Sequence, residues 1–143
     1  MMISTKGRYA LRIMIDLAEH NPEEYIRLKD IANRQNISEK YLETIIKALS
    51  QANFVQGLRG KGGGYRLTRE ASTYTIGSIL KLTEGSLAPV ACLDCSPNQC
   101  SRSKECKTLP MWEKLDKIID DYFESITLSD LLNTSLEGND FVI

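Results

Sequence analysis

Two short helices followed by a glycine-rich hairpin constrain the fold more than any other feature of this chain. Apolar residues at helical spacing predict one helix over residues 28–35 and another over residues 38–49. Asn36 tolerates the left-handed conformation that ends a helix, and Ser38 is a good N-cap for the second one. Two short helices joined by such a tight turn form a helix-turn-helix, whose second helix can lie in the major groove of DNA.

The segment after the second helix predicts a β-wing. Strand-forming residues at 54–56 and 65–67 flank the glycine-rich residues 57–64, which carry Arg59 and Lys61. A plain hairpin turn and the phosphate loop of a nucleotide enzyme are alternatives, but a phosphate loop runs from a strand into a helix. The order of strand, glycines and strand favours a wing, in which glycines allow close backbone approach and the two cations meet phosphates.

The remaining predicted elements are helical, so the expected fold class is mainly α with a small β-wing. In chain order they are a helix capped by Ser4 or Thr5 that ends before Pro22, a short helix over residues 75–83, a long helix from Pro110 and a short helix over residues 128–132. The overall expectation is a winged helix-turn-helix followed by a long dimerisation helix.

The helix from Pro110 carries the apolar stripe on which the dimerisation expectation depends. Its members repeat at alternating spacings of three and four residues, as in coiled coils, and the stripe covers about two heptads. They are Trp112, Leu115, Ile119, Tyr122 and Ile126, with Ile118 and Phe123 beside them. Packing against its own domain is the alternative, and the three aromatic residues and the distance from the wing favour dimerisation.

The charge of the chain is divided unevenly between its halves. The 143 residues, enough for one domain or two small ones sharing a core, have a formal net charge of −1. Residues 1–70 carry 12 Lys and Arg against 8 Asp and Glu, a net charge of +4, whereas residues 71–143 carry 6 against 11, a net charge of −5. A basic first half is consistent with binding DNA. No apolar run has the about 20 residues of a membrane span and no signal core is present, so a cytoplasmic protein is expected.

All four cysteines lie within fifteen residues. They are Cys92, Cys95, Cys100 and Cys106. A secreted disulfide scaffold spreads its cysteines along the chain, so this cluster indicates a metal or redox site. An iron–sulfur cluster, zinc held by four thiolates and a thiol switch are the three candidates, and spacing alone does not separate them.

Several separated motifs, in order, resemble the Rrf2 family of winged-helix transcriptional regulators. They are Ile-Ser-Thr-Lys-Gly-Arg-Tyr-Ala at residues 3–10, residues 38–42, Arg-Gly-Lys-Gly-Gly-Gly-Tyr at residues 59–65, Trp112 and residues 126–131. The resemblance covers nearly the whole chain and implies a homodimer that binds a double-stranded DNA operator. It divides the chain into a DNA-binding module at 1–70, a connecting helix and cysteine-rich sensor loop at 71–109, and a dimerisation helix with a C-terminal tail at 110–143.

The same resemblance implies which residues meet DNA. The recognition helix corresponds to residues 38–49, with Glu43 where relatives carry an acid that can accept a hydrogen bond from cytosine. Arg59 corresponds to a wing contact with the minor groove or a phosphate, and the start of the first helix to backbone contacts. The predicted DNA contacts are Lys6, Arg8, Ser38, Glu39, Lys40, Tyr41, Glu43, Arg59 and Lys61.

Cluster-binding members of the family resemble this chain in the spacing of their last two cysteines, which matches Cys100 and Cys106. Cys92 then fits as the first ligand better than Cys95. Leu109 stands where some members carry a histidine, and the single histidine, His20, is expected at the surface near the end of the first helix. The resemblance therefore implies a [4Fe–4S] or [2Fe–2S] cluster held by four cysteines, or by three with an outside ligand, and keeps zinc as the competitor.

The predicted function is a homodimeric repressor that senses an iron–sulfur cluster, iron or redox status through the cysteine loop. The alternative is a regulator of cysteine or sulfur metabolism that acts by thiol oxidation or through a protein partner, because residues 84–90 and the apolar ending 141–143 resemble the cysteine-metabolism repressor of the family. An enzyme is not expected. No Cys-x-x-Cys starts a helix beside a βαβ pattern, and no histidine or acid lies near with a nucleophile to activate.

Overall fold

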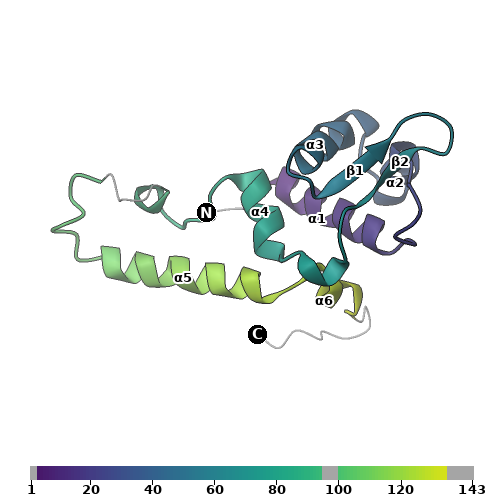
Figure 1. The fold of residues 1–143 in the computed structure, drawn as a ribbon. Helices are drawn as coiled ribbons and strands as arrows, with labels where there is room; N and C mark the ends of the chain where they lie inside the picture. The colour runs from purple at the N-terminus through teal and green to yellow at the C-terminus, as the bar shows by residue number, and fades with distance from the viewer. Residues whose placement is uncertain (1–2, 95–99, 135–143) are drawn as a thin grey trace.

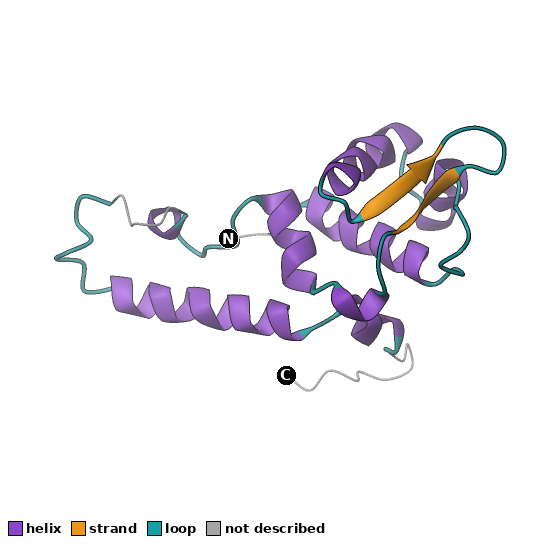
Figure 2. Cartoon of the chain, viewed as in Figure 1, coloured by secondary structure: helices purple, strands orange, loops and turns teal. Residues whose placement is uncertain are grey.

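A computed structural model describes residues 3–94 and 100–134 of the chain, and it is mainly helical with one two-stranded sheet (Figures 1 and 2). The elements are α1 (Thr5–Ala18), α2 (Leu28–Gln35), α3 (Glu39–Gln51), β1 (Val55–Leu58), β2 (Gly64–Leu67), a 3₁₀ turn (Ala71–Thr73), α4 (Ile76–Glu84), a second 3₁₀ turn (Ala91–Leu93), α5 (Leu109–Ser125) and α6 (Leu128–Leu132). None of these described helices is both long and apolar enough to cross a membrane.

Side-chain caps define where most of the helices begin. Ser4, Ser38 and Thr75 each accept a hydrogen bond from a backbone N–H in the first turn of α1, α3 and α4. Thr127 and Asp130 form a reciprocal capping box at α6. These pairings satisfy N–H groups that have no partner within their own helix, which is why such short helices start at defined residues.

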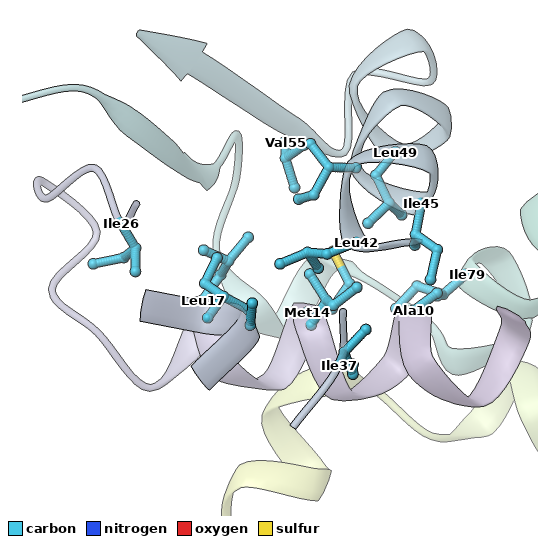
Figure 3. Close-up of a cluster of buried hydrophobic side chains, with 14 of the residues drawn as sticks. Ala10, Met14, Leu17, Ile26, Ile37, Leu42, Ile45, Leu49, Val55 and Ile79 are labelled. Carbon is cyan, nitrogen blue, oxygen red and sulfur yellow. The ribbon is translucent and has the colours of Figure 1, made fainter. Parts of the chain in front are cut away.

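The helix-turn-helix packs around one apolar cluster, shown in Figure 3. Its members come from α1, α2, α3, β1, α4 and α6 and from the loops that join these elements. Those labelled in the figure are Ala10, Met14, Leu17, Ile26, Ile37, Leu42, Ile45, Leu49, Val55 and Ile79. Asn36 has a φ of 54°, so the turn between α2 and α3 contains the left-handed residue that the sequence predicts. Ile37 follows it into the core, and its burial holds the two helices together.

The wing is an antiparallel hairpin in which Val55 pairs with Leu67 and Leu58 pairs with Gly64. The sequence predicts the first strand over 54–56, but the structure begins it one residue later. The reason is that the Phe54 N–H donates to the Leu49 carbonyl at 2.9 Å, which closes the end of α3 and removes this donor from the ladder. The strand then continues to Leu58, so it extends further toward the wing tip than expected.

The second half of the chain returns to the winged module. α4 packs on α1, and α5 is a long helix that begins far from the wing and runs back toward α6 (Figure 1). The segment that contains the cysteines joins α4 to α5, and its residues 100–108 lie at the end of the molecule far from the wing (Figure 1). Hydrogen bonds from Ile76 N–H to the Ile126 carbonyl and from Leu128 N–H to the Tyr74 carbonyl, at 2.8 and 2.9 Å, join the entry of α4 to the exit of α5.

The apolar stripe predicted on α5 is divided between two faces of the helix. Ile119 and Phe123 pack with Ile126 on the small core formed with α4. Met111, Leu115, Ile118 and Tyr122 are instead exposed, with 38–54% of their surface accessible. We call these four residues the α5 apolar face. The expected single stripe was therefore partly wrong, because one helix buries one side against its own domain and leaves the other uncovered within the chain.

Candidate nucleic-acid interface and cysteine segment

The start of α3 presents polar side chains to solvent. Glu39, Lys40 and Glu43 are exposed, and Ser38 is engaged as the N-cap, accepting from the Tyr41 N–H at 3.2 Å. Tyr41 differs from the other predicted contacts because it is half-buried, with its ring edge-on to Tyr9 at 5.7 Å between centroids. Its ring therefore packs α3 on α1, and its hydroxyl is the polar part of the side chain that can meet a ligand.

The other predicted DNA contacts flank α3. Arg59 and Lys61 are exposed in the turn between β1 and β2, where the wing expectation places them. Lys6 is half-buried and Arg8 exposed in the first turn of α1, and the Arg8 guanidinium donates to the Thr5 hydroxyl at 3.2 Å. Wing and helices are therefore assembled as in winged-helix proteins, in which such elements meet major-groove edges and phosphates.

A buried carboxylate that the sequence analysis missed fixes the helix-turn-helix. Asp16 of α1 has 2% of its surface exposed and accepts two hydrogen bonds from the Arg34 guanidinium, at 2.8 and 3.0 Å. The Gln35 amide donates a third at 2.9 Å. Burial would raise the pKa of Asp16, but these hydrogen bonds and the charge of Arg34 outweigh it, so the pKa lies below its ordinary value. The sequence did contain a signal for this buried carboxylate, because Asp16 stands among the regularly spaced apolar residues Ile13, Met14 and Leu17.

A second arginine joins α1 to the end of α2. The Arg12 guanidinium donates to the Gln35 side chain at 3.2 Å and to the Gln35 carbonyl. It also lies 5.0 Å from the centre of the Tyr9 ring. A cation at the C-terminal end of a helix is favoured by the helix dipole, so Arg12 helps to hold α2 against α1.

The end of α4 is tied to the beginning of α1. Glu84 Oε1 accepts hydrogen bonds from the Ser4 hydroxyl at 2.6 Å and from the Ser4 backbone N–H at 3.1 Å. Ser4 is the residue that caps α1, two positions before Lys6 and four before Arg8. A movement of α4 would therefore shift Ser4 and the start of α1, at one edge of the predicted DNA-binding surface.

α4 is also tied to α5. Lys81 pairs with Asp120, and with Glu124 at 3.0 Å, and both hydrogen bonds raise the pKa of its ammonium group. The Thr75 hydroxyl donates to Glu124 at 2.9 Å. Sequence reasoning did not find this group, because Lys81 and its carboxylate partners lie about forty residues apart. α4 is thus bonded to the winged module at its end and to the long helix along its length.

The described cysteines all lie within the segment between α4 and α5. Cys92 is half-buried in a 3₁₀ turn, Cys100 is exposed, and Cys106 is half-buried three residues before α5. Cys95 lies outside the described residues. In the described part of the chain, no three Cys, His, Asp or Glu side chains are gathered closely enough to hold a metal ion.

The chemistry of Cys106 nonetheless fits a thiolate-held group. Cys106 Sγ lies 3.2 Å from the Thr108 hydroxyl. Hydrogen bonding by the Thr108 side chain, supported by backbone N–H groups at the start of α5 and the charge of Arg102, lowers the pKa of the Cys106 thiol. Thiolates are the ligands that iron–sulfur clusters and zinc require. His20 is not near these donors in sequence, and its Nδ1 lies 2.7 Å from the Asp16 carbonyl oxygen in the winged module.

Comparison with known proteins identifies the family. Residues 3–134 match the Rrf2 family, described as "Iron-dependent Transcriptional regulator". The chain belongs to the Rrf2 family. It is 36% identical over 133 residues to the HTH-type transcriptional regulator IscR of Vibrio vulnificus, which covers 93% of this chain and 78% of that protein.

Solved structures of Rrf2 regulators resemble this one closely. The global cysteine regulator CymR of B. subtilis aligns with a TM-score of 0.76 at 37% identity, covering 92% of this chain and 96% of that one. The IscR of T. potens aligns with a TM-score of 0.73 at 39% identity, covering 92% and 86%. These matches confirm the predicted winged-helix fold class and show that this Rrf2 chain is a DNA-binding transcriptional regulator rather than an enzyme.

Proposed function

We propose that this Rrf2 protein is a homodimeric, cytoplasmic repressor that binds an operator in double-stranded DNA and reads iron–sulfur or redox status through its cysteine segment. α3 would enter the major groove with Lys40 and Glu43 at base edges, and the wing would place Arg59 and Lys61 at the neighbouring minor groove and phosphates. The observation that carries the sensing part is the position of the cysteine segment, which connects the two helices, α4 and α5, that are bonded to one another.

A second copy of the chain is the proposed occupant of the α5 apolar face. Met111, Leu115, Ile118 and Tyr122 follow one another at spacings of four, three and four residues, which is the pattern by which helices pair in coiled coils. Exposed apolar side chains contiguous along one helix are costly to leave in water. Pairing of two α5 helices would bury this face and give two winged modules for two half-sites.

The proposed ligands are Cys92, Cys100 and Cys106, with Cys95 as the candidate fourth. An iron–sulfur cluster, when bound, would supply a redox-sensitive group whose occupancy depends on the availability of iron and on exposure to oxidants. The chain's own part is to hold thiolates within the segment that joins α4 to α5. Thr108 and the first N–H groups of α5 favour the thiolate of Cys106, and Glu84 connects the same α4 to Ser4. Occupancy of the segment and DNA affinity would then be linked through α4.

A cluster-free thiol switch is the second candidate, and the lowered pKa of the Cys106 thiol favours it. A thiolate is the species that oxidants attack, and similarity to CymR, a cysteine regulator by its description, is as strong as similarity to IscR. In this version, oxidation of the cysteines or a protein partner would replace the cluster as the signal.

Anaerobic purification followed by visible absorbance and assays of iron and sulfide tests the first candidate. We expect a coloured protein whose absorbance is lost in Cys100→Ala and Cys106→Ala and retained in Ser103→Ala, a control in the same segment. A colourless protein with stoichiometric zinc would contradict the cluster. Regulation by iron that survives both cysteine substitutions would contradict it as well and favour the thiol-switch or partner version.

A further inference from the structure

A groove separates the recognition helix from the wing, and it holds a lysine that is absent from the predicted DNA contacts. Its lining comes from α2, α3 and β2 and consists of Leu28, Glu43, Lys47, Ser50, Gln51 and Tyr65. Lys47 is exposed and lies one helical turn after Glu43. Both side chains therefore point from the same face of α3 toward the wing.

The placement of α3 and the wing on DNA determines what must occupy this groove. A helix in the major groove and a wing tip in the adjacent minor groove lie on opposite sides of one sugar–phosphate strand, because that strand is the boundary between the two grooves of a duplex. We propose that this strand runs along the groove between α3 and β2, and that the Lys47 ammonium binds one of its phosphates. The inference rests on the proposed mode of DNA binding and adds a residue to it.

Tyr65 forms the wall of the groove opposite Lys47, and contacts within the protein hold it in place without a ligand. Tyr65 exchanges two backbone hydrogen bonds of 2.8 Å with Ile26, which fix the strand on that side. Its ring lies directly against Gly57 of β1, where a side chain carbon would overlap the ring atoms. Because this wall is already rigid, binding of the DNA sugar–phosphate backbone would immobilise few further side chains and so cost little conformational entropy.

The charges of the groove suit a phosphate at Lys47 and a base at Glu43. Within the described residues, Lys47 forms no ion pair, so its ammonium does not have to leave a carboxylate in order to bind DNA. Glu43 would repel a phosphate and is suited to a base-edge donor such as the cytosine amino group. Lys47 would thus offset the repulsion between Glu43 and the strand that passes beside it.

Titration of a fluorescent duplex of random sequence, about 30 base pairs long, tests Lys47 without knowledge of the operator. Binding is measured by anisotropy at several salt concentrations for the full-length protein, Lys47→Gln, Lys47→Arg and Lys114→Gln. The last variant removes the same charge from an exposed position on α5. Circular dichroism and sedimentation confirm that the variants fold and assemble as the parent does.

We expect Lys47→Gln to weaken binding by about three- to tenfold and to lower the slope of log affinity against log salt by about one. Lys47→Arg should restore both quantities, and Lys114→Gln should leave them unchanged. An unchanged affinity and slope in Lys47→Gln would overturn the inference while leaving the proposed function intact. A parent protein that binds no duplex under any condition would overturn both.

Discussion

The Ser4 hydroxyl donates a 2.6 Å hydrogen bond to the carboxylate of Glu84, eighty residues further along the chain. The Ser4 backbone N–H donates to the same oxygen at 3.1 Å, and the Ser4 hydroxyl also caps α1. One carboxylate at the end of α4 therefore fixes the residue that begins α1. Because the cysteine segment follows α4 directly, this pair lies between the proposed sensor and the proposed DNA contacts at Lys6 and Arg8.

Replacing Glu84 should uncouple the two regions. We expect Glu84→Ala to lower the free energy of unfolding by about 1–2 kcal/mol, since it removes two hydrogen bonds to a charged, half-buried acceptor. DNA affinity in Glu84→Ala should also respond less to removal of the cluster than it does in the parent protein. Urea unfolding and DNA titrations with and without the cluster measure the two effects.

The matched control for Glu84 is Glu70→Ala, which removes an exposed carboxylate and should cost less than about 0.5 kcal/mol. A double-mutant cycle with Ser4→Ala isolates the pair itself. If the two substitutions are additive, Ser4 and Glu84 do not act together and the proposed connection fails.

Asp16→Asn should destabilise the winged module. The substitution removes the charge that pairs with Arg34, whose side chain is 42% exposed and can be partly rehydrated, so we expect a loss of about 2–3 kcal/mol in the free energy of unfolding. Asp30→Asn is the control, because its pair with Arg27 is long at 3.6 Å and largely exposed and should cost less than about 0.5 kcal/mol. Equal losses in the two variants would mean that the buried pair adds no more to stability than the exposed pair and would contradict this prediction.

The same carboxylate predicts a dependence of stability on pH. The pKa of Asp16 is lowered in the folded protein, so its contribution is fully present above its ordinary value of 3.8 and is lost as the pH falls through the lowered folded value. Unfolding measured from neutral to strongly acidic pH should therefore show the parent protein and Asp16→Asn converging at the acid end. A difference that persists unchanged below the folded pKa would contradict this assignment.

Ile118→Asp should convert the protein from a dimer to a monomer. Ile118 is central in the α5 apolar face and is 54% exposed within one chain, so the substitution barely affects the chain alone but would bury a charge in a dimer. Sedimentation equilibrium measures the outcome. Glu113→Ala, also on the exposed surface of α5, should remain dimeric, and a dimeric Ile118→Asp would place the dimer contact elsewhere.

Local signals made most of the fold predictable. The left-handed turn at Asn36, the N-cap at Ser38 and the apolar spacing of α3 each depend on residues close together in the chain. Their effects can therefore be recognised in the amino-acid sequence alone. The wing was predictable for the same reason, since its glycines and cations are contiguous. The error at Phe54 arose where two local preferences compete, and the closing hydrogen bond of α3 took precedence over the strand.

The order of elements, the winged helix-turn-helix and the closeness of the four cysteines along the chain could be predicted, because caps, periodicity, glycine conformations and residue spacing are properties of neighbouring residues. Long-range packing brings Asp16 to Arg34 and Ser4 to Glu84, and it divides the apolar stripe of α5 between a core and an exposed face. Each of these depends on the rotation and crossing of whole helices. Helix periodicity tells which residues share a face, but only packing determines what that face touches.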